Sequence, residues 1–288
     1  MAMSALPILA TTAGAAAAAW VARGVFWPRA QLFGRTIFRG SRDDPPRVAL
    51  TFDDGPHPEA TDAILGILRQ YDVPAAFFVV GSNVIRWPDV LRRIDAAGHT
   101  IGNHTFDHAY HGIIRGPRYW REQVAKTDEA IEQTIGRRTT LFRPPMGFKS
   151  LPIKWAVKRH GHRVVTWSRR ARDGVRTTSE RIIDRVSDAA AGDIILLHDG
   201  VAPGKHRDPT PTVEALPRVI ETLRERGLSF VSLEGFLGAK SVEVEEHEAM
   251  NDARDSAASG LGPCGPRPEA VRVHTMSTVS QPSRYSLS

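Results

Sequence analysis

The sequence has very little cysteine, with Cys264 as the single residue of this type among 288. One thiol cannot form an internal disulfide framework or a cysteine-rich zinc site. The sequence also lacks a G-x-S-x-G motif and a phosphate-binding loop, which disfavours serine-hydrolase and nucleotide chemistry. The stretch Gly260–Gly265 matches a dinucleotide-binding pattern, but it follows no strand-like run and contains Pro263, so we discount it.

The arginines do not gather into one basic tract, although the formal net charge is +6. Such a charge favours anionic surroundings, among them cell-wall polymers, phospholipid headgroups and nucleic acid. The short clusters at residues 137–138 and 169–172 lack the interleaved aromatic side chains on which a single-strand binder stacks bases. We therefore expect no nucleic-acid partner.

The first stretch of the chain carries no charge before Arg23. It is long enough to span a bilayer as a helix of roughly 20 residues. No lysine or arginine precedes it, unlike the basic start of a secretory signal, and four arginines follow it by residue 39. We expect residues 1–27 to be a membrane anchor or an uncleaved signal, with its orientation open. This predicts a membrane-anchored protein of the bacterial cell envelope, with a cytoplasmic location as the alternative.

The middle of the chain alternates strand-like and helix-like patterns. Hydrophobic residues make up 41% of the sequence, enough for one domain of about 200 residues with extensions. A polar, proline-bearing linker over residues 28–46 precedes the pattern, and a disordered tail over residues 239–288 follows it. Seven strands are expected between them: Val48–Phe52, Ala75–Val80, Thr100–Gly102, Thr140–Phe142, Arg163–Trp167, Ile194–Leu197 and Ser229–Leu233. Strands that alternate with helices predict a parallel α/β sheet, either doubly wound or closed as a barrel.

Polar side chains of catalytic type stand at the carboxyl ends of five of these strands. In parallel α/β folds such ends meet on one face of the sheet, which is where working residues gather. The sequence therefore predicts one site built from the Asp53-Asp54 pair, the His104/His108 pair, Arg143, Asp173 and His198.

His104 and His108 are four residues apart, so a helical turn would point both imidazoles the same way. With one carboxylate they form a set that suits Zn²⁺ or a similar divalent ion. Thr105 stands where zinc proteases carry a glutamate, so the general base must come from elsewhere, and an adjacent aspartate is the natural supplier. The structural alternative is a pair of surface or capping histidines in a loop.

Asp53 and Asp54 repel each other unless they differ in role or protonation state. A metal that holds Asp54 would leave Asp53 free to take a proton from water. Arg143 could keep Asp53 ionised through a fork-shaped pair. The alternatives are an ordinary turn at Asp53-Asp54-Gly55 and an ordinary surface arginine at 143.

His198 follows a strongly apolar run, so its imidazole stands at the rim of the core and could titrate near neutrality. Taken alone, His198 would be interpreted as a core histidine whose ring nitrogens are hydrogen-bonded to a neighbouring residue. Asp173 is a plausible orienting partner, although Asp193 and Asp199 are nearer in sequence.

In their order and spacing these motifs resemble the polysaccharide deacetylases that share the NodB homology domain, carbohydrate esterase family four. The motifs are TFDDGP, HTFDH, RPPMG, WSRRARD and LLH, and the resemblance defines a domain over residues 47–238. It implies a distorted (β/α)7 barrel of parallel strands with surrounding helices.

The resemblance also implies roles. Asp53 would be the catalytic base, and Asp54, His104 and His108 the ligands of a divalent metal, Zn²⁺ or Co²⁺. Arg143 would tune the base, Asp173 would orient His198, and His198 would be the general acid. The backbone amide of Met146 would stabilise the oxyanion, and Leu196 would line the acetyl pocket.

Two residues depart from the family pattern. Met146 stands where an aromatic residue is common, and Gly174 where tryptophan often follows the fourth motif. Both changes concern the substrate groove rather than the proposed chemistry.

The expected function is metal-dependent hydrolysis of N-acetyl groups on N-acetylhexosamine residues of a glycan, with peptidoglycan first and chitin-type oligosaccharides behind it. One alternative is an O-acetyl esterase acting on xylan-type polymers with the same residues. Another is a catalytically silent glycan-binding module on the same fold.

Overall fold

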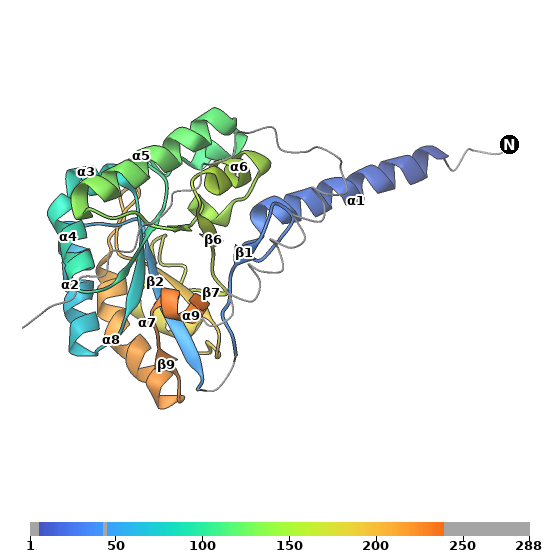
Figure 1. The fold of residues 1–288 in the computed structure, drawn as a ribbon. Coiled ribbons are helices and arrows are strands. Elements are labelled where there is room, and N and C mark those ends of the chain that lie inside the picture. Colours follow the sequence, from blue (N-terminus) through green and yellow to red (C-terminus); the bar gives the residue numbers. More distant parts are fainter. Residues whose placement is uncertain (1–5, 43–44, 239–288) are drawn as a thin grey trace, which may run out of the picture. The chain divides into compact units, whose positions relative to one another are not determined.

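The computed structural model describes residues 6–42 and 45–238, which form one nine-stranded parallel sheet surrounded by helices (Figure 1). The strands are β1 (Thr36–Ile37), β2 (Arg47–Asp53), β3 (Ala75–Val79), β4 (Thr100–Asn103), β5 (Leu141–Phe142), β6 (Arg163–Val165), β7 (Arg169–Arg170), β8 (Ile194–His198) and β9 (Ser229–Phe230). The helices are α1 (Leu6–Phe26), α2 (Pro58–Gln70), α3 (Gly81–Arg86), α4 (Pro88–Ala96), α5 (Pro117–Ile135), α6 (Leu151–Arg159), α7 (Ser179–Val186), α8 (Thr210–Glu225) and α9 (Leu233–Gly238).

The expected fold class is confirmed. The strands run in the order β1-β6-β5-β4-β3-β2-β8-β7, with β9 paired to β2. All seven expected strands are present, and the short strands β1 and β7 were not expected from the sequence. In the described part of the chain, β1 and β7 are the two edge strands of this order and do not pair with each other. The curled sheet is therefore an open barrel.

The central strand β2 sets the position of the candidate site. Its residues from Val48 to Asp53 are buried, as is typical of a parallel strand covered on both faces. Asp53 stands in register with Phe78 of β3 and with His198 of β8. The core on one side of the sheet includes Phe52 and Phe77, whose rings stack with centroids 5.1 Å apart. The packed core next to the carboxyl ends of the strands therefore holds Asp53 and its neighbours in place.

The segment after α1 is part of the sheet. The predicted linker over residues 28–46 contains β1, which pairs with β6, and Arg39, which forms an ion pair with Asp193. No helix in the ranges 6–42 and 45–238 is long and apolar enough to cross a membrane, and the predicted membrane anchor is not supported. The predicted disordered tail, residues 239–288, lies outside the described residues.

Candidate active site

The parallel sheet brings the sequence-predicted residues to one edge. Asp53 ends β2 and His198 ends β8, while His104 and Arg143 directly follow β4 and β5. Asp173 follows β7 after a short connection. It is buried like Asp53, His104 and Arg143, whereas the side chain of His198 is 16% exposed. The structure thus gathers residues that are up to 145 positions apart in the sequence.

Asp54, His104 and His108 form a buried cluster with the donor set of a divalent-metal site. One ligand atom from each residue lies within 4.8 Å of the other two. Asp54 Oδ1 is 3.7 Å from His104 Nε2 and 3.4 Å from His108 Nε2. This carboxylate oxygen is buried without a hydrogen-bond partner among the described residues, a costly state that a cation would relieve. The residues present therefore fit a metal ion, and two imidazoles with one carboxylate suit Zn²⁺.

The two histidines converge through a loop and not through the expected helical turn. Residues 104–108 are non-helical, with positive φ angles of 69° at Thr105 and 50° at His108. This left-handed backbone reverses the chain so that both Nε2 atoms face Asp54. The four-residue spacing predicted the convergence correctly, but its structural reason was wrong.

His104 is held in its neutral form. Its Nδ1 lies 2.7 Å from the carbonyl oxygen of Arg143, so Nδ1 carries the proton and donates it, and Nε2 is left for a metal. Burial, reinforced by the neighbouring His108, lowers the pKa of His104 to about 3. A surface role for this histidine is excluded, because its side chain is only 2% exposed.

Arg143 contacts Asp53 through one nitrogen and does not form the expected fork. Its Nη1 donates to Asp53 Oδ1 at 2.7 Å and to Thr51 Oγ1 at 2.9 Å. The rest of the guanidinium donates to backbone carbonyls of residues 165 and 166, and the side chain is fully buried. Burial raises the pKa of Asp53 and outweighs the opposing effects of Arg143 and His198. The correction follows from geometry, because the other donors of Arg143 are occupied by the backbone of β6 and its end.

His198 is paired with Asp173, as expected. His198 Nδ1 lies 2.8 Å from Asp173 Oδ1. Burial alone would lower the pKa of His198, but Asp173 and the aspartates of the site raise it to about 9. The nearer aspartates have other partners, since Asp193 pairs with Arg39 and Asp199 accepts from Thr61 Oγ1 at 2.6 Å.

The residues assigned to the substrate groove flank this centre. Met146 has a positive φ of 58° and is 49% exposed. Within the described residues no carbonyl accepts its backbone N–H. Leu196 is buried in β8 and belongs to the same apolar cluster as Trp167. Gly174 lies against the outer edge of His198, where an added Cβ would be 3.1 Å from Nε2.

Sequence reasoning missed a supporting network behind the loop that carries His104 and His108. Asn103 Oδ1 accepts the backbone N–H of Thr105 at 2.8 Å, and Asn103 Nδ2 donates to Asp128 Oδ1 of α5 at 2.7 Å. Asp128 also contacts His162 Nε2, with 2.9 Å to its Oδ2. Asn103 could have been noticed because it adjoins His104, but nothing local marks Asp128.

Two further residues that were missed hold Asp173. Thr212 Oγ1 at the start of α8 donates to Asp173 Oδ2 at 2.9 Å. Arg207 donates to the Asp173 carbonyl at 2.8 Å. Both lie more than 30 positions from Asp173 in the sequence, so no motif could have identified them.

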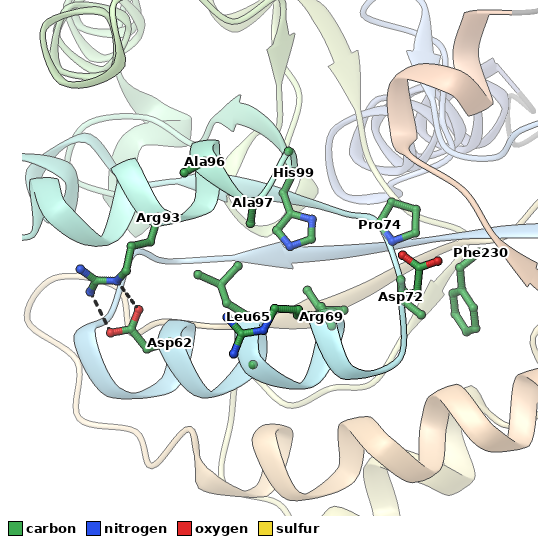
Figure 2. Close-up of a pocket in the computed structure, with 14 residues that line it drawn as sticks. Asp62, Leu65, Arg69, Asp72, Pro74, Arg93, Ala96, Ala97, His99 and Phe230 are labelled. Carbon is green, nitrogen blue, oxygen red and sulfur yellow. Dashed lines mark hydrogen bonds and ion pairs between the residues drawn. The ribbon is translucent and has the colours of Figure 1, made fainter.

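A separate cavity of about 990 Å³ lies between α2 and α4 (Figure 2). Its wall includes Pro74 and His99, which directly precede β3 and β4. It therefore lies at the amino ends of the strands, whereas the candidate site lies at their carboxyl ends. Asp62 and Arg93 pair across its rim at 2.8 Å. None of the catalytic or metal-binding candidates lines this cavity.

Comparison with known proteins gives consistent matches. The sequence profile described as "Polysaccharide deacetylase" matches residues 40–165. A peptidoglycan-N-acetylglucosamine deacetylase of Bacillus cereus is 36% identical over 188 residues, which are 65% of this chain and 66% of that protein. A chitooligosaccharide deacetylase of Azorhizobium caulinodans is 36% identical over 194 residues, 65% of this chain and 92% of that protein. The crystal structure of a peptidoglycan N-acetylglucosamine deacetylase bound to a benzamide compound superposes with a TM-score of 0.64 and 33% identity, covering 70% of this chain and 92% of that one.

Proposed function

The chain belongs to the polysaccharide deacetylase family and is an enzyme of that class, and from this premise we propose that it hydrolyses N-acetyl groups on N-acetylhexosamine residues of a glycan. The observation that carries the proposal is the division of roles between adjacent carboxylates. Asp54 faces two imidazoles with an unpartnered oxygen, while Asp53 is held by Arg143. The names of the relatives favour peptidoglycan or a chitin-type oligosaccharide as the substrate.

Asp54, His104 and His108 would hold the divalent metal, with Zn²⁺ preferred and Co²⁺ as the substitute. When bound, the metal would supply Lewis acidity to the acetyl carbonyl and lower the pKa of water.

Asp53 would act as the base. Arg143 binds Oδ1, so Oδ2 is left to take the proton of the attacking water. Burial raises the pKa of Asp53, which makes the carboxylate a stronger proton acceptor than a solvated aspartate. The free N–H of Met146 would donate to the oxyanion that develops on the acetyl oxygen, and this interaction strengthens as charge forms.

His198 would be the general acid that protonates the departing amine. With a pKa of about 9, its imidazole carries the required proton at neutral pH. Asp173 fixes the ring through Nδ1, so Nε2 is the atom that delivers the proton.

Acetate release tests the proposal. The enzyme is assayed with added Zn²⁺ or Co²⁺ on peptidoglycan, chitin oligomers and acetylxylan, beside Asp53→Asn. We expect the wild type to release acetate from an N-acetylated glycan. Asp53→Asn should release none, although it should still bind the metal. Release from acetylxylan alone would favour the O-acetyl esterase. Binding of glycans without any release would favour the silent module.

An action on peptidoglycan would place the enzyme in the cell envelope. That location is a proposal, supported by the relatives that act on peptidoglycan. Fractionation of cells that express the full chain tests it, and recovery only in the cytoplasmic fraction would contradict it.

A further inference from the structure

One face of the molecule combines exposed aromatic side chains with cations. The protein has six tryptophans, and the three that are at least half exposed lie here: Trp20 (63%), Trp27 (50%) and Trp155 (55%). Phe26 and Leu151 are also exposed on this face, at 55% and 46%. We call it the aromatic–basic face, made of Trp20, Arg23, Phe26, Trp27, Arg29, Leu151, Lys154, Trp155, Lys158 and Arg159.

Specific contacts join the two parts of this face. The Lys149 backbone N–H donates to the Val25 carbonyl at 3.1 Å. Lys149 Nζ donates to the carbonyls of Trp27 and Pro28 at 2.8 and 2.7 Å. The rings of Phe26 and Phe148 meet edge to face at 5.1 Å. The carboxyl end of α1 is therefore held against the segment that leads into α6, and β1 after α1 pairs with β6 after α6.

The outer face of α6 has an unusual composition for a helix exposed to water. Its inner positions, Ile153, Ala156 and Val157, are buried. Its outer positions pair Leu151 with Trp155 and Lys154 with Lys158, each at a spacing of four residues. An exposed helix normally carries mixed polar residues there, whereas apolar and basic residues together are typical of a helix lying on a lipid surface.

Two segments of the sequence supply the cations of this region, and five of their sixteen lysines and arginines pair with acidic residues from other segments. Residues 1–42 contain five arginines and no acidic residue, and residues 133–172 contain eleven lysines and arginines and no acidic residue. Pairing of β1 with β6 brings these two segments together, so basic residues that are scattered in the sequence gather in the fold. Arg23, Lys154 and Lys158 are exposed and form no ion pair with any residue in the described ranges.

We propose that the aromatic–basic face binds the surface of an anionic lipid bilayer. Tryptophan side chains prefer the headgroup level of a membrane, and lysine and arginine are attracted to anionic headgroups. A single-stranded nucleic acid would need a groove that tracks its backbone, whereas these side chains stand on the outward faces of two helices. The cations of the face would pair with anionic headgroups while its aromatic side chains insert among them. This combination favours a bilayer over a nucleic acid as the partner.

Docking in this way would bring the candidate site close to the membrane. Gly147 packs against Pro28, since a Cβ on Gly147 would lie 3.3 Å from Pro28 Cγ. The half-exposed Met146 directly precedes Gly147 in the same loop. If the proposed function holds, the substrate is a glycan carried on the membrane or lying next to it. The binding itself does not depend on catalysis.

Sedimentation with vesicles tests the proposal on the full chain. Binding to phosphatidylglycerol–phosphatidylcholine vesicles is compared with binding to phosphatidylcholine alone at low ionic strength. Each cation near an anionic bilayer changes partitioning about fivefold, so Lys154→Gln/Lys158→Gln should weaken it roughly 25-fold. Trp155→Ser should weaken it severalfold and remove part of the blue shift in tryptophan fluorescence that vesicles cause.

Arg69→Gln/Arg181→Gln is the matched control. These exposed arginines lie on α2 and α7, away from the face, and form no ion pair with the described residues. The control makes the same charge change and should bind vesicles like the wild type. All variants should keep the wild-type melting temperature and acetate release from soluble oligomers, because none touches the candidate site.

Three outcomes would overturn the proposal. The first is no vesicle binding, or an equal loss in the control and the Lys154/Lys158 variant. The second is binding of a single-stranded oligonucleotide, but not of vesicles, that the same lysine substitutions abolish. The third is concentration-dependent dimerisation that Trp155→Ser abolishes while vesicles are not bound. Sedimentation needs no turnover, so failure of the proposed deacetylation would leave its result intact.

Discussion

Both carboxylate oxygens of Asp173 are directed at His198. Oδ1 lies 2.8 Å from Nδ1 of the ring, and Oδ2 accepts the backbone N–H of the same histidine at 2.8 Å. The bond at Nδ1 leaves Nε2 as the only ring atom available to a substrate. Partial burial of the ring disfavours its charged form, so its raised pKa depends on the negative charge of Asp173 and of the other site aspartates. This pair therefore controls the pH range in which a protonated His198 is available.

The variant Asp173→Asn should shift the alkaline limb of the pH profile. Without the charge of Asp173, burial lowers the pKa of His198 from about 9. The acid is then lost at a lower pH, so the alkaline limb of kcat/KM for acetate release should move down by about one pH unit or more. Thr212→Val, which removes one hydrogen bond to Asp173 Oδ2, should cause a smaller shift. An unchanged profile in Asp173→Asn would contradict the assignment of His198 as the acid.

Asp128 should support metal binding through the loop that carries His104. Asp128→Asn weakens the hold on Asn103, whose side chain fixes Thr105 between the two proposed histidine ligands. Partners behind metal ligands change affinity by about 10- to 100-fold, and we expect the lower end because Asp128 acts through Asn103. The Zn²⁺ dissociation constant measured by chelator competition checks this. The control is Glu129→Gln, on the next residue of α5 with an exposed contact to Gln133, and equal affinities in both variants would exclude the role.

The sequence was sufficient to predict the residues that stand directly at strand ends. Asp53 and His198 are 145 positions apart, yet their meeting follows from two apolar runs becoming neighbouring parallel strands. A parallel sheet places the carboxyl ends of such runs on one edge, whatever the loops do. For this reason the fold class and the set of site candidates could be predicted without coordinates.

Contacts made by loops and distant helices could not be predicted in the same way. The backbone of Thr105 and His108 is left-handed, which the spacing of two histidines does not reveal. His198 pairs with Asp173 and not with Asp193, which is nearer in sequence, because Asp193 is paired with Arg39. Arg39 belongs to a segment that was expected to be a linker. Asp128 and Thr212 reach the site from helix positions, where a polar residue is ordinary. Each of these contacts depends on tertiary packing rather than on a local pattern.

Lys149 should make stability depend on pH in the alkaline range. Burial lowers its pKa from 10.5 to about 8 in the folded protein. Between these two values the unfolded chain binds more protons than the folded one, so this lysine's contribution to the free energy of unfolding rises as pH increases from about 8 to 10.5. Lys149→Gln should remove that rise, which urea unfolding at pH 7.5, 9 and 10.5 would measure. The exposed Lys154→Gln is the matched control, and an identical pH dependence in both variants would contradict the prediction.

Gly200 and Gly66 have opposite surroundings, and together they test how tightly the chain is packed around Asp54, the proposed metal ligand that follows β2. A Cβ on Gly200 would overlap the carbonyl group of Asp54, which is backbone and cannot rotate away. Gly200→Ala should therefore lower the free energy of unfolding by about 2–3 kcal/mol and weaken metal binding, because Asp54 must shift.

Gly66 lies within α2, and an added Cβ there would meet no atom within 4 Å. Gly66→Ala should raise the free energy of unfolding by about 0.5–1 kcal/mol without affecting metal affinity. If Gly200→Ala kept wild-type stability and metal affinity, the close approach of residues 54 and 200 would have no part in holding the ligand.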